Sequence, residues 1–518
     1  MLKSYPLHQS RTPIQRALIS VFDKTGLEPL ARTLQEQGVE ILSTGGTARA
    51  LRAAAIPVTD VSEYTGFPEI MDGRVKTLHP LVEGGILGLR DHHAREAEDS
   101  GVLWIDLVVC NLYPFGDVMS RRDAALTEAL EYIDIGGPTL IRSAAKNVGW
   151  VTVVVDPADY DIVAAALKQK GGIDFDLRRR LAAKAFRHTA AYDTLISGYL
   201  TEELFPDQQT IALERAFSLR YGENPHQQAA VYREAGARTW SVLNATIHQG
   251  KQLSYNNLMD ADGALACLRE FTEPACVVVK HANPCGVAIG HDILDVYTRA
   301  FQADALSAFG GIIALNRTCT AAVAEAIRKV FVEIVLAPDF EPEALAILSR
   351  KKNLRVLSVG PVPAPERHLT YRHITGGFLV QESNVASVDR TRASQVTDGK
   401  PTDEDWSQMD FAWRVLKHVK SNGILLVKDW TTVGIGPGQV SRVDAVEIAL
   451  RKAGERARGA ILASDAFFPF RDSIDKLKGT GIRGVIQPGG SIRDQEVIDA
   501  CNEQGLFMVF TGQRCFRH

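Results

Sequence analysis

The sequence predicts an α/β protein of more than one domain, the first domain being built on a mainly parallel sheet. Short apolar segments alternate with helix-like segments from residue 17 onward, as in chains of βα units. A length of 518 residues implies two to four domains at about 100–200 residues each. A polar, proline-containing stretch at 201–210 is the best candidate for a linker. We therefore expect an N-terminal extension at 1–16, a first domain at 17–200, a linker at 201–212 and a second domain at 213–518.

Composition excludes several classes of protein. The chain has 58 Lys and Arg against 62 Asp and Glu, so it lacks the basic excess of a nucleic-acid binder. It contains no run of about 18 apolar residues and no apolar N-terminal signal, so neither a membrane span nor secretion is expected. Seven scattered cysteines without a CxxC pair suit a reducing compartment. We expect a cytoplasmic protein that binds small molecules.

The elements of the first domain follow in order along the chain. Thr25 and Glu28 have the spacing of a capping box, which would open a helix ending near Gly38. Asp156-Pro157 is typical of a helix start. Buried strands are predicted at 17–22, 39–43, 103–112 and 150–155.

Two loops after the first two strands have the physical design of a phosphate cradle. They are 23–26 (DKTG) and 44–47 (TGGT), in which glycines expose backbone amides and hydroxyls add donors. Neither loop matches a Walker A or GxGxxG motif. Each could equally be a tight strand-to-helix turn.

Charged side chains after later strands could manage protons. Arg74 and Lys76 alternate with an apolar residue, so in an extended segment both cations would point the same way and hold an anion or a reacting oxygen. The alternative is a solvated basic edge. Tyr113, Asp134 and Lys146 supply a phenol, a carboxylate and an amine, the ingredients of a proton-relay site, although each alone has an ordinary structural explanation.

The most informative segment of the second domain is 280–286 (KHANPCG), directly after the apolar strand 276–279. Lys280 and His281 would leave the strand beside a proline-glycine turn and face one pocket. A neighbouring ammonium favours neutral imidazole, which suits a general base. A zinc deaminase would carry HxE followed by PCxxC. Asn283 and Ala288 occupy the glutamate and second cysteine positions, so we expect a metal-free site.

Further glycine- and aromatic-rich segments lie toward the C-terminus. Arg442 follows the glycine-rich loop 433–441 and could clamp a phosphate. The segment 464–472 (SDAFFPFRD) is either a buried aromatic cluster or a stacking slot for a flat heterocycle, with Asp472 bonding its nitrogens.

Taken in series, these motifs resemble a known family. SVFDKTG, STGGTA, TGFPE, GRVKTLHP, CNLYPF, IDIGG and RSAAKN are followed by RYGENPHQ, KHANPCG, GIGPGQVSR and SDAFFPFRD. Together, over nearly the whole chain, they resemble the bifunctional AICAR transformylase/IMP cyclohydrolases. The resemblance implies a methylglyoxal-synthase-like parallel-sheet domain and a larger transformylase domain of two cytidine-deaminase-like α/β subdomains without zinc. It also implies a homodimer with transformylase sites shared between subunits.

The resemblance implies two reactions, the last two steps of de novo purine biosynthesis. A formyl group passes from 10-formyltetrahydrofolate to AICAR, and the product, FAICAR, closes to IMP with loss of water. No metal or redox cofactor is required. The implied catalytic residues are Lys280 and His281 for transfer, and Lys146, Lys76, Tyr113 and Asp134 for ring closure.

The binding residues implied by the resemblance fall into three sets. Glu333 stands where some members of the family have aspartate. The sets are Phe22, Asp23, Lys24, Thr44, Gly45, Gly46, Thr47, Arg74, Thr77, Cys110, Asn111 and Ile135 for the cyclohydrolase nucleotide; Arg220, Tyr221, Gly310, Glu333, Asn422, Arg442 and Arg514 for AICAR; and Phe467, Asp472, Ser491 and Ile492 for folate.

The alternative from another class is a regulatory nucleotide-binding protein, because methylglyoxal-synthase-like modules also sense ligands. Lys146 with Asp134, and Lys280 with His281, favour the enzyme, since a sensor would not need them.

Overall fold

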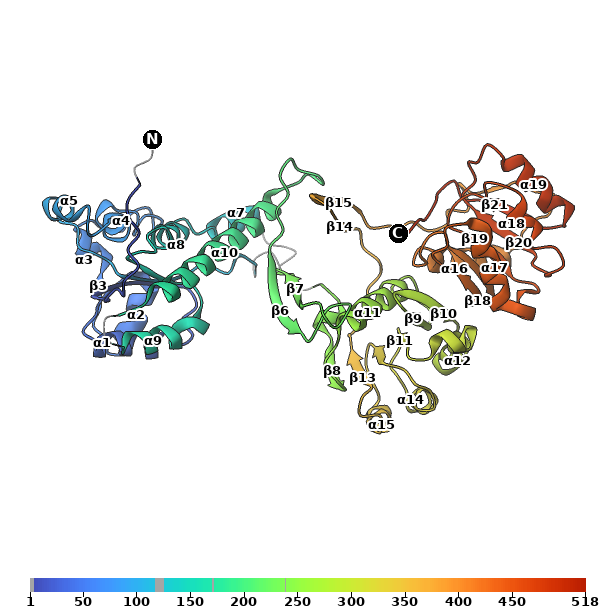
Figure 1. Cartoon of the computed structure of the whole chain (residues 1–518), viewed down its shortest axis with the longest axis horizontal. Helices are drawn as coiled ribbons and strands as arrows, with labels where there is room; N and C mark the ends of the chain where they lie inside the picture. Colours follow the sequence, from blue (N-terminus) through green and yellow to red (C-terminus); the bar gives the residue numbers. More distant parts are fainter. Residues whose placement is uncertain (1–3, 117–124, 170–171, 238) are drawn as a thin grey trace. The chain divides into compact units, whose positions relative to one another are not determined.

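The computed structural model describes all residues except 1–3, 117–124, 170–171 and 238. The chain forms two compact units (Figure 1). Unit 1 contains residues 1–216 and 232–238, and unit 2 contains 217–231 and 239–518. The finer boundaries at 17–200, 201–212 and 213–518 remain predictions.

Unit 1 is built on a five-stranded sheet with the order β3-β2-β1-β4-β5, in which every pairing is parallel. α1, α2 and α9 contribute to the core on one face, α4 and α8 to the core on the other, and α10 to both (Figure 1). The elements are β1 (Arg16–Val21), α1 (Leu27–Glu36), β2 (Glu40–Ser43), α2 (Gly45–Ala53), β3 (Thr59–Asp60), α3 (Val61–Thr65), α4 (Pro80–Leu87), α5 (Ala94–Asp99), β4 (Leu107–Asn111), α7 (Leu126–Glu131), α8 (Gly136–Lys146), β5 (Thr152–Val154), η1 (Pro157–Asp159), α9 (Tyr160–Leu167) and α10 (Phe175–Leu200).

One local prediction in unit 1 is wrong. Thr25 and Glu28 do not form a capping box, because α1 begins after Gly26, whose φ of 68° places it in the left-handed region. The Asp23 carboxylate instead accepts a hydrogen bond from the Thr25 amide at 2.9 Å, which closes the loop before the helix. The predicted helix start at Asp156 is confirmed, since its carboxylate accepts a hydrogen bond from the Ala158 amide at 2.9 Å.

Unit 2 is built on a twelve-stranded sheet with the order β16-β21-β20-β19-β17-β18-β10-β9-β11-β12-β13-β8. Its elements, with the hairpin β6–β7 that the two units divide, are β6 (Leu213–Leu219), β7 (Ala229–Glu234), η2 (Val242–Asn244), β8 (Thr246–Gln249), α11 (Tyr255–Leu268), β9 (Ala275–Lys280), β10 (Asn283–Ile289), α12 (Ile293–Ala303), α13 (Ala305–Ala308), β11 (Ile312–Leu315), α14 (Ala321–Arg328), β12 (Ile334–Ala337), α15 (Pro342–Leu348), β13 (Arg355–Ser358), β14 (Leu369–Ile374), β15 (Gly377–Glu382), β16 (Ser394–Gln395), α16 (Asp403–Leu416), β17 (Ile424–Lys428), β18 (Thr431–Gly436), α17 (Arg442–Ala453), η3 (Gly454–Ala457), β19 (Ile461–Ser464), α18 (Asp472–Asp475), β20 (Gly484–Gln487), α19 (Asp494–Glu503) and β21 (Phe507–Phe510).

The sheet of unit 2 is mixed, because antiparallel hairpins β9–β10 and β17–β18 interrupt the βα pattern that the sequence suggested. Its strands fall into two halves with the same order, β10-β9-β11-β12-β13 and β18-β17-β19-β20-β21, joined where β10 pairs with β18. α11 and α16 share one core on one face of the sheet. α12, α14 and α15 cover the other face of the first half, and α17, α18 and α19 that of the second. Unit 2 is therefore an internal duplication, which agrees with the two predicted subdomains.

The duplication extends to single residues. A Cβ atom on Gly286 of β10 would lie 1.9 Å from the Ala300 carbonyl oxygen of α12. A Cβ atom on Gly434 of β18 would lie 2.2 Å from the Ala449 carbonyl oxygen of α17. Each hairpin therefore needs glycine where its second strand packs against the following helix. Across the described residues, we find no helix with the length and apolar character of a membrane span.

Candidate active sites

The predicted catalytic pair of unit 2 lies at a tight hairpin turn. Lys280 is the last residue of β9 and pairs with Asn283 of β10, so His281 and Ala282 are the two turn residues. Their φ values of 55° and 57° are those of a type I′ turn, which usually takes asparagine or glycine. Left-handed φ values strain the backbone of residues other than glycine, and such strain is typical of functional sites. The proline-glycine turn expected beside them is instead part of β10, which has a bulge there.

The Lys280 ammonium is fixed at this strand exit. Its Nζ donates a hydrogen bond to the Phe309 carbonyl oxygen at 2.9 Å. Gly310, with φ of 70°, follows directly, and a Cβ atom there would lie 3.0 Å from that Nζ. Glycine at this position therefore leaves room for the lysine.

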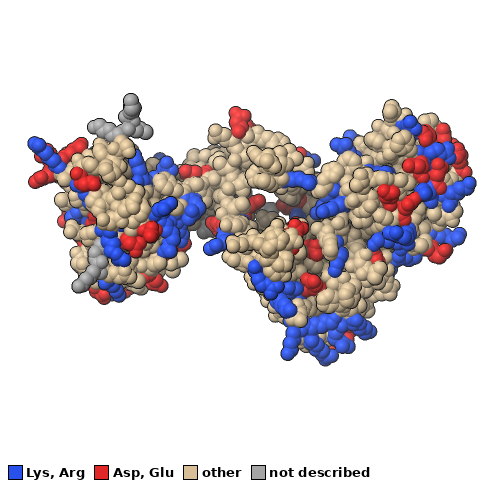
Figure 2. Space-filling model, in the orientation of Figure 1, with Lys and Arg blue, Asp and Glu red and all other residues tan. Residues whose placement is uncertain are grey.

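Lys280 and His281 line a cavity of about 1450 Å³ in unit 2. The Glu333 carboxylate in its wall accepts a hydrogen bond from Asn257 Nδ2 at 2.7 Å and lies 3.7 Å from Arg355 Nη1. The surface around the ends of α14 and α15 is strongly basic (Figure 2), and Lys329, Lys351 and Lys352, which follow these helices, line the cavity. The predicted residues that share this cavity are Lys280, His281, Arg220, Tyr221, Gly310 and Glu333.

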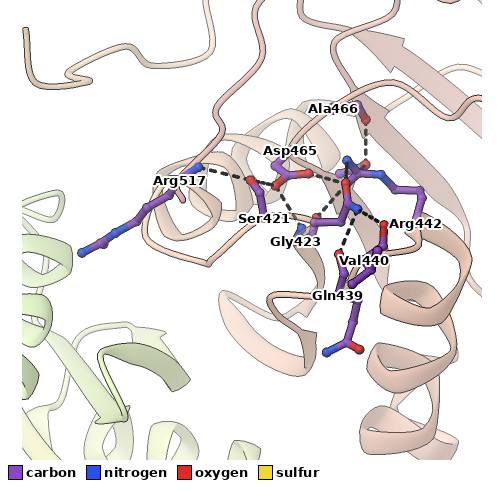
Figure 3. A network of polar contacts seen from close by, with 10 residues as sticks. Ser421, Gly423, Gln439, Val440, Arg442, Asp465, Ala466 and Arg517 are labelled. Carbon is purple, nitrogen blue, oxygen red and sulfur yellow. Dashed lines mark hydrogen bonds and ion pairs between the residues drawn. The ribbon is translucent and has the colours of Figure 1, made fainter. Parts of the chain in front are cut away.

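A second cavity of about 720 Å³ lies in the other half of unit 2. Its wall includes Arg442, whose guanidinium donates hydrogen bonds to the fully buried Asp465 carboxylate and, at 2.6 Å, to Asn422 Oδ1 (Figure 3). Asp465 also accepts hydrogen bonds from Ser421 Oγ and from the Gly423 amide, the latter at 2.9 Å. The predicted residues in this lining are Asn422, Arg442, Arg514, Phe467 and Asp472.

Two predicted folate residues lie outside that lining. Ser491 and Ile492 follow the lining residue Gly490, but Ile492 is fully exposed. The Ser491 hydroxyl accepts a hydrogen bond from the Arg493 amide at 3.1 Å and so closes the local turn. Unit 2 therefore divides the predicted AICAR residues between two cavities. Lys280 and His281 line the first, and the folate residues Phe467 and Asp472 line the second.

The phosphate-cradle loops of unit 1 meet at the carboxyl ends of β1 and β2. Asn111 Oδ1 accepts hydrogen bonds from the Phe22 and Asp23 amides at 2.6 and 3.0 Å, which fixes the first loop. Thr47 is buried, and its hydroxyl is bonded to the Val21 carbonyl oxygen at 2.9 Å. The hydroxyl of Thr47 therefore holds α2 to β1, and the glycines of 44–47 form the first turn of α2.

A titratable cluster lies next to these loops. Lys76 Nζ lies 3.9 Å from the position of a Cβ atom on Gly45 and interacts electrostatically with Asp134. Asp134 Oδ1 accepts a hydrogen bond from the Gly137 amide at 2.8 Å at the start of α8. Burial raises the pKa of Asp134 above its usual range, opposed by that hydrogen bond and by Lys76. Burial also raises the pKa of the Cys110 thiol, with the Asp134 charge adding to it.

The other predicted residues of unit 1 make local contacts, and two of them are not placed as expected. The Tyr113 ring packs edge-on against Phe22 at 5.6 Å, Lys24 Nζ donates to the Phe22 carbonyl oxygen at 3.1 Å, Thr77 lies against Gly136, and Ile135 is largely exposed. Arg74 lies in a turn and is bonded to Glu131, so it does not form the expected extended pair with Lys76. Lys146 is the last residue of α8, about 15 Å along the helix from its first residue, and is therefore not brought to Asp134.

Sequence reasoning missed the buried groups that support these sites. Asp260 and Asn257 of α11 line the first cavity, and Asp465 holds the second. The repeated pattern VVVKHA and LLVKDW could have revealed the two hairpins. Among the described residues, no group of three or more His, Cys, Asp or Glu is placed to hold a metal ion, and all seven cysteines are free.

An α/β chain with cation-lined cavities at strand exits defines a protein that handles small anionic molecules. The AICARFT/IMPCHase bienzyme family matches residues 144–452, and the MGS-like domain matches residues 26–139. The chain belongs to this family and is a bifunctional enzyme of purine biosynthesis.

The chain is similar to curated relatives over its whole length. It is 51% identical over 509 residues to the bifunctional purine biosynthesis protein PurH of Bacillus cereus (strain G9842), covering 97% of this chain and all of the relative. The same values hold for PurH of Bacillus anthracis (strain CDC 684 / NRRL 3495). A solved structure described as the crystal structure of ForH is 38% identical, covers 36% of this chain and all of that chain, and has a TM-score of 0.33.

Proposed function

We propose that unit 2 transfers the formyl group of 10-formyltetrahydrofolate to the 5-amino group of AICAR. The observation that carries this proposal is the strained hairpin that presents Lys280 and His281 to one cavity. The aromatic amine of AICAR is a poor nucleophile, so His281 accepts its proton as nitrogen attacks the formyl carbon. Lys280 stabilises the oxyanion that develops. The C–N bond to the folate then breaks, and the folate nitrogen regains a proton.

The binding residues support the same assignment. Arg220 and Tyr221 hold the AICAR nucleotide. The Arg220 guanidinium donates a hydrogen bond to the Tyr221 hydroxyl at 3.1 Å, and its carbon lies 4.8 Å from the centre of the Tyr221 ring. Asn422 and Arg442 contribute from the second cavity, and Phe467 stacks on the folate ring. The other proposed contacts are Gly310, Glu333 and Arg514 for AICAR and Asp472, Ser491 and Ile492 for folate.

We infer that unit 1 closes FAICAR to IMP. The carboxamide nitrogen attacks the formyl carbon within one molecule, so binding mainly selects a folded conformer. Lys76, Tyr113 and Asp134 polarise the carbonyl oxygen and move the protons that leave as water. The loops at 22–24 and 44–47, together with Arg74, hold the 5′-phosphate and the ribose. The position of Lys146 at the far end of α8 favours an indirect role for its amine.

We propose that the protein is a homodimer. A homodimer would allow Arg442 of one subunit and His281 of the other to serve one substrate, which the division of the AICAR set between two cavities supports. Mixing His281→Ala with Arg442→Ala protein should then restore part of the transformylase activity.

We also propose a cytoplasmic location, which seven free thiols support.

The test assays the two reactions separately on purified protein. His281→Ala should abolish consumption of 10-formyltetrahydrofolate with AICAR and leave ring closure of supplied FAICAR nearly intact. Lys76→Ala should do the reverse, and Lys146→Ala should lower ring closure less than Lys76→Ala. A wild-type protein that binds AICAR but leaves 10-formyltetrahydrofolate unconsumed would instead be a nucleotide sensor.

A further inference from the structure

The turn that carries His281 is held by a carboxylate of α11. Asp260 Oδ1 accepts a hydrogen bond from the Ala282 amide at 2.6 Å, and the His281 amide also interacts with this carboxylate. Asp260 is partly buried in the wall of the first cavity and interacts electrostatically with both His281 and Lys280. One side chain thus contacts the strained backbone and the charges of the catalytic pair.

The second half of unit 2 contains the same turn, with aspartate in place of the histidine. Lys428 pairs with Thr431, and the two turn residues, Asp429 and Trp430, both have φ of 51°. Here the Asp429 amide donates to Gln408 Oε1 at 2.9 Å. Gln408 occupies in α16 the position that Asp260 occupies in α11, six residues after the capping serine or threonine.

The comparison of the two turns separates backbone support from charge. An amide oxygen is sufficient to hold the turn at Asp429, so holding the turn does not require a negative charge at position 260. We infer that Asp260 is a positioning residue for formyl transfer, whose carboxylate both fixes the turn and offsets the positive charge around the His281 imidazole. This inference rests on the proposed function of unit 2.

The cations around the turn give the negative charge of Asp260 a role. Burial raises the pKa of Asp260, while the hydrogen bond from Ala282 and the charges of His281 and Lys280 oppose that shift and favour the ionised carboxylate. Without it, α11 would supply no negative charge among the cations that surround the catalytic pair. The other charged side chains that line the cavity are Arg220, Lys251, Lys329, Lys351, Lys352, Arg355 and Lys420, with the carboxylates Glu223 and Glu333.

The experiment compares Asp260→Asn with wild-type protein in the transformylase assay between pH 5 and 9. Asparagine keeps an acceptor oxygen for the Ala282 amide but removes the charge. We expect the plateau of kcat to fall by about tenfold and the acidic limb of the kcat/KM pH profile to move to lower pH, because the turn loses the negative charge of Asp260. KM for AICAR should stay within about twofold, since Asp260 does not contact the substrate in this scheme.

Gln408→Ala is the matched control, because it removes the acceptor from the equivalent turn away from the cavity. It should lower the thermal midpoint and leave the acidic limb where wild type has it. An unmoved limb in Asp260→Asn, or an asparagine variant that does not fold, would overturn the inference while the wild-type activity stands. A wild-type protein without transformylase activity would overturn the proposed function and this inference together.

Discussion

The buried ion pair behind the second cavity should be the most sensitive point of unit 2. Asp465 is fully buried and accepts hydrogen bonds from Arg442, Ser421 and Gly423 (Figure 3). Asp465→Ala would leave the buried Arg442 guanidinium without its counter-charge, at about 3–5 kcal/mol. The Gly423 amide would lose its acceptor as well, at about 1–3 kcal/mol. Because these costs overlap, we expect unit 2 to lose roughly 4 kcal/mol of unfolding free energy.

Hydrogen exchange in rising urea measures this loss by region. Peptides from β17 and β19 should lose protection at lower urea, whereas peptides from unit 1 act as an internal reference. Asp475→Ala is the matched control, because Asp475 is an exposed partner of Arg471 and its removal should cost about 1 kcal/mol or less. A loss in Asp465→Ala no larger than in Asp475→Ala would refute the reasoning.

A double variant separates stability from function. Arg442→Met with Asp465→Leu replaces the buried pair by apolar groups, a change that is often neutral or stabilising. We expect most of the lost stability to return while transformylase activity stays absent, since Arg442 is proposed to bind AICAR. Recovery of activity together with stability would remove Arg442 from the site.

Three further changes test other parts of the structure. Gly310→Ala places a Cβ atom 3.0 Å from Lys280 Nζ and should lower transformylase kcat at least about tenfold. Gly376→Ala is the control, because φ is also positive there but the space around the new Cβ atom is open, and it should leave kcat unchanged. Asp134→Asn keeps an acceptor for Gly137 and should cut ring-closure kcat about 100-fold. Burial raises the pKa of Asp134 in the folded state, so ionising this carboxyl destabilises the folded protein above the unfolded pKa. The variant has no carboxyl to ionise and should therefore unfold at an equal or higher temperature than wild type at pH 7. This gain in thermal stability should disappear in acid, where Asp134 of the wild type is protonated. Glu270→Gln should flatten the acid side of the curve of stability against pH, measured by thermal unfolding. Burial alone would raise the pKa of Glu270, but His418 and Lys417 outweigh burial and lower the pKa. The ionised carboxylate therefore stabilises the protein above its unfolded pKa, and this stabilisation is lost as the pH falls through its folded pKa.

The sequence predicted best what neighbouring residues determine. Lys280 and His281 are adjacent at the end of a strand. Because ligand sites of α/β sheets lie beyond the carboxyl ends of the strands, the sequence predicted that both residues face one cavity. Lys146 was separated from Asp134 because the residues between them form one continuous helix, a distance that motif order does not reveal. The supports of both cavities, Asp260 and Asp465, depend on contacts between elements far apart in the chain, and no local pattern distinguishes them from surface carboxylates.

The two halves of unit 2 show why the fold alone could not indicate which hairpin carries the proposed catalytic residues. Both hairpins carry a lysine at the strand exit, two left-handed turn residues and a glycine beside the lysine, as Gly310 and Gly459 demonstrate. They differ in the side chains that surround that frame: histidine against aspartate in the turn, and a carboxylate against an amide below it. Since the backbone is shared, the function proposed for the first hairpin rests on these side chains. The proposed transformylase site is then one arrangement of charges on a scaffold that the same chain uses twice.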